Sequence, residues 1–131
     1  MAKQVKKTDT DFEIAFYNGI LQKKPDFIEA MMALGDLYTN AGMYSEGMAI
    51  DEKLVQLRPD DPVVLYNLAC SYSLLNQINE AYRSVKKAIN CGYSDFDHLE
   101  RDQDLLNLRG DRRFQTYYSR VKRKKLAENK K

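Results

Sequence analysis

The apolar residues of this chain recur every three or four positions, as they do in amphipathic helices that bury one face. One apolar stripe runs through residues 31–38 and another through 65–75. Each is followed by a residue suited to a left-handed turn, Gly42 or Asn76, and then by a second stripe. The pattern predicts two helical hairpins, with apolar or small positions Met31, Leu34, Gly35, Tyr38, Gly47, Ile50, Leu54 and Leu57 in the first and Leu65, Leu68, Ala69, Tyr72, Leu75, Ala81, Val85, Ala88 and Ile89 in the second.

The two hairpins repeat one another at a fixed period. A shift of 34 residues places nine positions of the first hairpin over nine similar positions of the second. This period is typical of helix-turn-helix arrays, in which each unit buries its apolar face only by stacking on its neighbours. We therefore predict one repeat over residues 28–61 and a second over residues 62–95. The matched pairs are Pro25/Pro59, Asp26/Asp60, Leu34/Leu68, Gly35/Ala69, Tyr38/Tyr72, Gly42/Asn76, Glu46/Glu80, Gly47/Ala81 and Val55/Ile89.

These positions resemble the tetratricopeptide repeat family, whose pattern combines a Leu-Gly pair, a Tyr, small residues and a Pro. Leu34, Gly35 and Tyr38 match it, whereas Asp51, Leu54 and Tyr93 depart from it. The resemblance implies an all-α fold, a right-handed superhelix of about seven helices. It also implies a non-catalytic scaffold or adaptor that binds other proteins. The end of the chain is similar to the closing segment of small bacterial members of the family.

The segments on either side of the two repeats are expected to complete the array, which would cover residues 8–120. We predict a leading helix over residues 9–23, and a degenerate third repeat with a capping helix over residues 96–120. Residues 1–7 are expected to form a basic, disordered N-terminus, and residues 121–131 a basic tail. The third repeat is inferred from Leu99, Leu106 and Gly110, which follow Leu65, Tyr72 and Asn76 by 34 residues.

Composition places the chain in the class of globular proteins. Its 131 residues suit one domain, and 44% of them are hydrophobic while 31% are charged. No apolar run reaches the roughly 18 residues of a membrane-spanning helix, and the N-terminus leads into no hydrophobic signal segment. Cys70 and Cys91 are too few for a disulfide framework. We expect a cytoplasmic protein with reduced thiols.

The net charge of +2 conceals a strong polarity along the chain. Residues 109–131 hold ten Lys and Arg against two Asp and Glu, whereas residues 8–108 hold eight against seventeen. The basic end indicates an alternative function, binding of nucleic acid or another anionic surface through the C-terminal helix. Because the body is acidic, we expect nucleic acid to be an improbable partner. A second alternative is self-association through Tyr117 or Tyr118, although a monomer is favoured over a dimer.

The chain offers little for catalysis or for binding a metal. His98 is the single histidine, and a cation site beside it competes with a simpler interpretation, a helix start rich in acidic residues. Phosphate-binding glycine loops and nucleophile motifs are absent from the sequence. We expect no catalytic residues, no metal and no cofactor. The acids near His98 are Asp95, Asp97, Asp102 and Asp104.

A binding groove on the first helices of the repeats is the remaining candidate site. The resemblance implies that these helices line a concave surface, whose outward positions follow from the buried stripes. Acidic residues predominate there around an apolar centre. We expect an unknown protein or peptide partner with a basic end and an apolar anchor. The predicted groove residues are Glu29, Met32, Asp36, Val63, Tyr66, Asn67, Cys70, Asp97, Glu100, Arg101 and Asp104.

Some family members bind the C-terminal carboxylate of chaperones through a clamp of Lys, Asn and Arg side chains. Asn67 and Arg101 occupy two of the clamp positions in this chain. Met32, Asp36 and Asp97 occupy the other three, and two carboxylates would repel the ligand. We therefore do not expect a carboxylate clamp.

Overall fold

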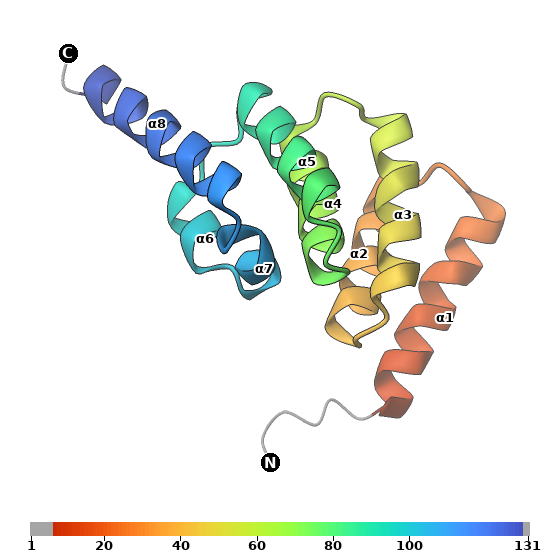
Figure 1. Cartoon of the computed structure of the whole chain (residues 1–131). Coiled ribbons are helices and arrows are strands. Elements are labelled where there is room, and N and C mark those ends of the chain that lie inside the picture. Colours follow the sequence, from red (N-terminus) through yellow and green to blue (C-terminus); the bar gives the residue numbers. More distant parts are fainter. Residues whose placement is uncertain (1–6, 130–131) are drawn as a thin grey trace.

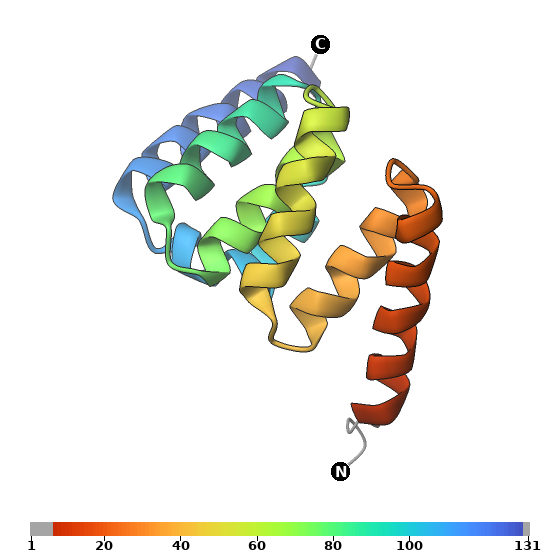
Figure 2. The same ribbon diagram turned by 90° about the vertical axis from the view of Figure 1, so that its right-hand side faces the viewer.

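A computed structural model describes residues 7–129 of the chain, and within that range eight α-helices and one 3₁₀ turn follow one another without any strand. Figures 1 and 2 show the helices succeeding one another from α1 at one end to α8 at the other. The elements are α1 (Lys7–Lys23), α2 (Ile28–Asn40), α3 (Tyr44–Leu57), α4 (Pro62–Leu74), α5 (Ile78–Asn90), α6 (Phe96–Arg101), η1 (Gln103–Leu105), α7 (Leu106–Arg109) and α8 (Arg112–Asn129).

The predicted all-α helix-turn-helix array is confirmed. The count of eight helices exceeds the expected seven because the segment after residue 95 breaks into two short helices joined by the 3₁₀ turn. The expected disordered N-terminus at residues 1–7 lies almost wholly outside the described residues. None of the helices within residues 7–129 combines the length and the apolar character that crossing a membrane requires.

Local sequence sets the ends of the two hairpins. Asp61 caps α4, because its Oδ1 accepts hydrogen bonds from the backbone N–H groups of Val63 and Val64 at 2.9 and 3.2 Å. Pro62 occupies the first helical turn, where its missing N–H costs nothing. Gly42 and Asn76 turn each hairpin in the left-handed region, with φ of 79° and 59°. These are the equivalent positions of the 34-residue period.

The paired helices of the first hairpin approach closely at Gly35 and Gly47. A Cβ atom on Gly47 would lie 2.9 Å from Thr39 Oγ1, and one on Gly35 would lie 3.3 Å from Asp51 Oδ1. A side chain at residue 47 would therefore have to displace Thr39, whereas one at residue 35 would require only a small movement of its neighbours. The second hairpin has alanine at the equivalent positions.

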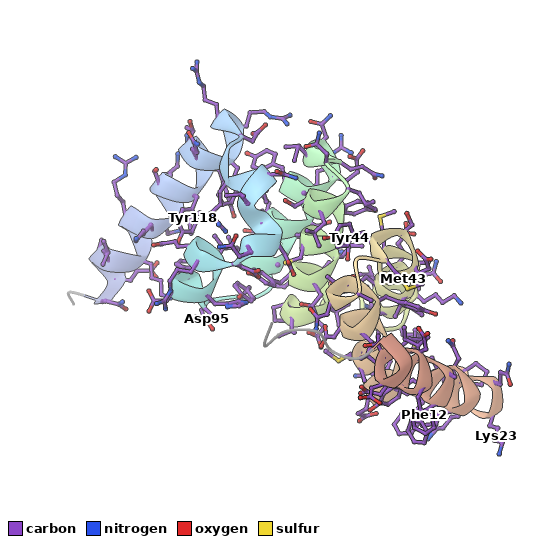
Figure 3. All side chains as sticks on the ribbon, turned by 90° about the horizontal axis from the view of Figure 1, so that it is seen from below. Phe12, Lys23, Met43, Tyr44, Asp95 and Tyr118 are labelled. Atoms are coloured by element: carbon purple, nitrogen blue, oxygen red, sulfur yellow. The ribbon has the colours of Figure 1, made fainter. Side chains whose placement is uncertain are left out.

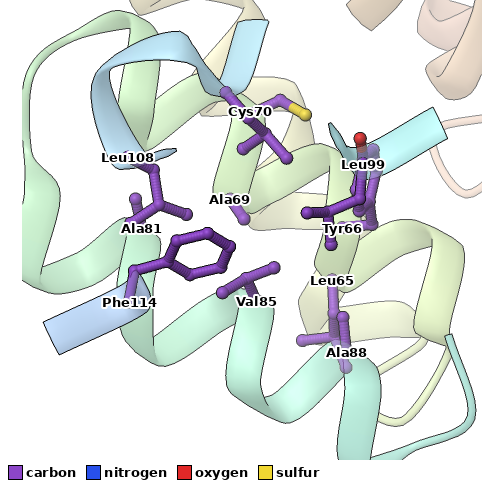
Figure 4. Close-up of a cluster of buried hydrophobic side chains, with 11 residues drawn as sticks. Leu65, Tyr66, Ala69, Cys70, Ala81, Val85, Ala88, Leu99, Leu108 and Phe114 are labelled. Atoms are coloured by element: carbon purple, nitrogen blue, oxygen red, sulfur yellow. The ribbon is translucent and has the colours of Figure 1, made fainter. Parts of the chain in front are cut away.

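The main hydrophobic core joins the second hairpin to the C-terminal segment. Phe114 of α8 reaches into it and is 2% exposed. Figure 4 shows its ring among side chains of α4, α5 and α7. A smaller cluster of Met31, Leu54 and Val64 joins the first hairpin to α4, with Leu21 of α1 packed against it. The main core consists of Leu65, Tyr66, Ala69, Cys70, Ala81, Val85, Ala88, Leu99, Leu105, Leu108 and Phe114.

Polar contacts fix the irregular segment between α5 and α8. The Arg109 guanidinium donates to the backbone carbonyls of Leu99, at 2.9 Å, and Asp102. Ser73 of α4 accepts from the Leu108 N–H at its Oγ, 3.1 Å away, and from the Asn107 amide at its carbonyl, 3.0 Å away. These bonds satisfy backbone groups that the short helices leave unpaired.

The last helix differs from the predicted division into a cap and a tail. α8 runs without interruption from Arg112 to Asn129, so helix continues through residue 121, where the basic tail was expected to begin. Its far half is held against α6 because Lys122 Nζ lies 2.7 Å from Glu100 Oε2 and Lys125 Nζ donates to the Ser94 carbonyl at 2.8 Å. Tyr118, labelled in Figure 3, donates to the same Glu100 carboxylate.

The leading helix α1 packs on α2 with one side and leaves aromatic side chains on the other. Asn18 Nδ2 donates to the Tyr38 hydroxyl at 3.2 Å. Phe12, labelled in Figure 3, is 71% exposed, and Phe16 is 54% exposed. Among the described residues, the exposed aromatic surface of the chain therefore lies on α1, whereas Tyr117 and Tyr118 are half-buried.

Replacing Phe114 with alanine tests whether α8 contributes to the core. We expect Phe114→Ala to lower the free energy of unfolding by about 3–5 kcal/mol, because it empties a buried aromatic site. The matched control is Phe12→Ala, which removes an exposed ring and should change stability by less than about 0.5 kcal/mol. Urea unfolding followed by circular dichroism measures both. Equal effects of the two variants would contradict the packing described for α8.

Candidate functional site

A polar pocket of about 210 Å³ lies between α2, α4 and the segment of residues 98–104. We call it the acidic pocket because four of its lining residues are aspartates. The first helices of the two repeats supply two of its walls, and the segment of residues 98–104 supplies the third. Its lining residues are Gly35, Asp36, Thr39, Asp51, Tyr66, Asn67, Cys70, Ser71, His98, Asp102 and Asp104.

Asp102 is the centre of the hydrogen bonds in the acidic pocket. Its Oδ2 accepts from the Tyr66 hydroxyl at 2.7 Å and lies 3.1 Å from His98 Nε2. The Cys70 thiol is 3.7 Å from the same oxygen. Its Oδ1 accepts from the Asp104 N–H at 3.0 Å and so caps the 3₁₀ turn. Asp102 therefore ties the segment of residues 98–104 to α4 while forming part of the pocket wall.

Two contacts hold Tyr66 in place, one on a face of its ring and one at its hydroxyl. It stacks on Tyr93 with ring centroids 4.2 Å apart and planes 7° apart, and its hydroxyl binds Asp102. The side chain is only 3% exposed. Tyr66 is therefore a buried, fixed part of the pocket lining, whereas the sequence analysis listed it among the outward-facing residues of the groove.

Asp51 is a buried acid that the repeat pattern does not account for. Its Oδ2 accepts from the Ser71 hydroxyl at 2.5 Å, which links α3 to α4. Burial raises the pKa of Asp51 from 3.8 to about 6, the bond from Ser71 opposes that shift, and the nearby Asp36 carboxylate adds to it. The pocket thus contains a carboxyl group that titrates close to neutral pH.

The remaining acids of the pocket also lack a compensating cation. Burial raises the pKa of Asp36, and burial with the neighbouring Asp102 raises the pKa of Asp104. Among the described residues, neither Lys nor Arg lines the pocket, and His98 is its one basic side chain. A cation entering this space would relieve the repulsion among the carboxylates.

The pocket offers no activated nucleophile within the described residues. Burial raises the pKa of the Tyr66 hydroxyl and of the Cys70 thiol, so both groups stay protonated at neutral pH. Cys70, Asp102 and Asp104 do place three potential metal ligands within 4.8 Å of one another. The hydrogen bonds of Asp102 account for its position without a metal, and the protonated thiol is a poor ligand.

The structure brings together five of the eleven residues expected to form the groove: Asp36, Tyr66, Asn67, Cys70 and Asp104. Glu29, Val63, Asp97 and Arg101 are exposed outside the pocket. Met32 packs against the cluster of Met31, Leu54 and Val64. Glu100 points toward α8 instead, because Tyr118 and Lys122 bind its carboxylate.

Asp51 and Asp102 line the pocket, but neither was among the predicted groove residues. The spacing of His98 and Asp102 places both on one helical face, which is the signal that was available. That spacing does not show that Tyr66, 36 residues before Asp102, would be their partner. Asp51 was visible only as a departure from the family pattern.

The titration of Asp51 predicts how stability depends on pH. Because the pKa of Asp51 is higher in the folded protein, its protonated form is favoured by folding. Its contribution is complete below about pH 4 and is lost as the pH rises through about 6. Asp51→Asn should therefore gain about 2–3 kcal/mol relative to the wild type between pH 4 and pH 8. Urea unfolding at several pH values measures this difference, and a constant difference would contradict the raised pKa.

Comparison with known proteins agrees with this architecture. The tetratricopeptide repeat profile matches residues 28–61 and 63–90, which are the two hairpins. The solved structure titled MamA 41-end from Desulfovibrio magneticus RS-1 superposes with a TM-score of 0.64. It is 16% identical, and the match covers 89% of this chain and 68% of that one. At this identity the likeness concerns the fold alone.

Three curated relatives match over most of this chain. A chloroplastic protein of Arabidopsis thaliana is 30% identical over 96 residues, which are 71% of this chain and 27% of the relative. The peroxisomal targeting signal receptor of Komagataella phaffii is 29% identical over 88 residues, 67% and 15% of the two chains. The 7-cyano-7-deazaguanine synthase of Coxiella burnetii is 28% identical over 86 residues, 65% and 37% of the two chains.

This chain therefore spans between about a seventh and a little over a third of the length of the curated relatives it matches. The shared part is the helical array, so the likeness does not extend to the activity of a whole relative. The 34-residue period, the hairpin geometry and the profile match all lead to one assignment. The chain belongs to the tetratricopeptide repeat family.

Proposed function

We propose that this chain is a non-catalytic protein-interaction module that binds a peptide segment of a partner at the acidic pocket. The observation that carries the proposal is the charge of Asp36 and Asp104, which no Lys or Arg of the pocket lining compensates, in a half-enclosed space. The family supports a protein-binding role, because such arrays present extended surfaces to other proteins. One of the relatives described above is named as a peroxisomal targeting signal receptor.

The chemistry of the pocket favours a Lys or Arg side chain as the group that enters it. About 210 Å³ accommodates the end of one such side chain, not a folded element. Carboxylates bind ammonium and guanidinium groups through charge-assisted hydrogen bonds, which are stronger where water is partly excluded. The Asn67 amide at the same wall adds a donor and an acceptor for the peptide backbone.

An apolar contact beside the pocket completes the proposed recognition. Val63 begins α4 on the same helix as Tyr66 and Asn67, and 48% of its surface is exposed. We assign it as the anchor for an apolar residue of the peptide. Met32 and Tyr66, which the sequence analysis listed in the same groove, are packed within the protein instead. The proposal keeps the expected cytoplasmic setting and a monomeric chain.

Peptide selection on the full chain tests the proposal. We expect a random peptide library to yield binders enriched in Lys or Arg, and Asp36→Asn with Asp104→Asn to weaken the best binder at least about tenfold. Fluorescence titration with the labelled peptide measures the affinity. Because burial raises the pKa of both acids, neutralising them should leave the melting temperature unchanged or higher.

The matched control is Asp97→Asn, which removes an exposed acid of α6 outside the pocket. It should leave the affinity within about twofold of the wild type, and rising salt should weaken the wild type more than the double variant. Binders without basic residues, or equal losses in the control and the double variant, would refute the assignment to the acidic pocket.

A further inference from the structure

A second pocket, of opposite charge, lies between α5 and α8. It is an open hollow of about 460 Å³ on the surface, and we call it the basic pocket. Figure 2 shows α8 running beside α5 at the end of the array, and the Arg113 guanidinium joins the two helices by donating to Asn79 Oδ1 at 2.6 Å. The residues that give the pocket its character are Tyr82, Lys86, Arg112, Arg113, Tyr117 and Arg120.

Two of the cations of the basic pocket, Lys86 and Arg113, lie over aromatic rings. Tyr82 and Tyr117 meet edge to face with centroids 6.0 Å apart. The Lys86 ammonium lies 5.0 Å from the centre of the Tyr82 ring and 5.4 Å from that of Tyr117, and the Arg113 guanidinium lies 5.4 Å from that of Tyr82. A cation held on a ring face keeps its full charge for a ligand.

The charge of the basic pocket is largely uncompensated. Arg113 forms an ion pair with Asp111 at 3.3 Å. Among residues 7–129, Lys86, Arg112 and Arg120 form no ion pair. Asp111 also caps α8 by accepting from the Phe114 N–H at 3.1 Å, so an incoming anion would meet side chains instead of helix amides.

Tyr117 supplies a polar group that the folded chain leaves unused. Its hydroxyl is shielded from solvent and has no hydrogen-bond partner among the described residues. Such a group costs free energy until it finds an acceptor, so a ligand oxygen reaching it after a small side-chain shift would be stabilised. Burial and the neighbouring Tyr82 raise the pKa of Tyr117, which keeps the hydroxyl a donor.

Two of the other basic residues of α8 are engaged by contacts outside this pocket. Lys122 is paired with Glu100, and Lys125 donates to the Ser94 carbonyl and lies over the Phe96 ring at 4.3 Å. Arg123 and Lys124 are exposed nearer the end of α8 and do not line the pocket, whereas Lys86, Arg112 and Arg120 gather their charge within it. A single compact anion fits that arrangement better than a nucleic-acid backbone, whose affinity rests on many phosphate contacts along a surface.

We propose that the basic pocket binds the phosphate group of a phosphorylated side chain in a protein partner. A phosphate monoester carries nearly two negative charges at neutral pH and three acceptor oxygens. Lys86, Arg112 and Arg120 supply the free positive charge, and the Tyr117 hydroxyl supplies a further donor. The site is separate from the acidic pocket and does not depend on peptide binding there.

Chemical-shift titration of the full chain in about 0.15 M salt tests the proposal. The probes are N-acetyl-O-phosphoserine amide, its unphosphorylated form and a single-stranded DNA of about 20 nucleotides. We expect the phosphorylated probe alone of the first two to shift the signals of Lys86, Thr116 and Tyr117. The double variant Lys86→Gln, Arg120→Gln should bind it at least about tenfold more weakly.

Two further variants separate the site from general charge. Lys124→Gln removes one exposed cation of α8 outside the pocket and should leave binding within about twofold of the wild type. Tyr117→Phe should weaken binding about threefold or more without lowering the melting temperature, because the hydroxyl it removes has no partner in the free protein.

Three results would overturn the proposal. The first is equal binding of the phosphorylated and unphosphorylated probes, and the second is no shift with either. The third is DNA binding that Lys124→Gln weakens as much as the pocket variants do, which would assign α8 to nucleic acid. Asp36→Asn with Asp104→Asn should not change any of these titrations, so failure here is distinct from failure of the proposed peptide site.

Discussion

Closure of the last hairpin by the C-terminal segment is the contact on which both pockets depend. A helical hairpin in an array cannot bury its apolar face alone, so something must cover α4 and α5. Leu99, Leu105 and Leu108 do this with no exposed surface, and Phe114 completes the cover. The same chain that seals the core therefore carries Asp102 and Asp104 to α4, and Arg112 and Tyr117 to α5.

Buried polar contacts turn this closure into a defined geometry. Hydrophobic burial is not directional, and by itself it would allow the short helices to slide. Arg109 binds two carbonyls of the segment, Ser73 binds its backbone from α4, and Asp102 accepts the Tyr66 hydroxyl. Each bond is favoured because the alternative is an unsatisfied group away from water. The acidic pocket is a consequence of this arrangement, since its third wall is the segment that these bonds hold.

Sequence periodicity predicted the array well and its covered surfaces poorly. The 34-residue shift placed both hairpins and identified Gly42 and Asn76 as turn residues, because turn geometry depends on local backbone preference. It could not show that Tyr66 and Cys70 would be covered, since the covering residues lie more than 30 positions away. Gly110 shows the limit of the period: its φ is −78°, and the repeat breaks into short helices there.

The acidic and basic residues of the whole chain nearly cancel, which leaves a net charge of +2. The structure nevertheless gathers some of each kind into two separate pockets. Salt screens both in the same way, because a Debye length of about 8 Å at physiological ionic strength is similar to the size of either site. Changing pH does not distinguish them either. The Asp51 carboxyl gains its charge near pH 6, and a phosphate monoester gains its second charge at about the same pH. Both interactions should strengthen together above that pH. Changes to individual residues, such as Asp104 in one pocket and Arg120 in the other, assign a binding event to one of them.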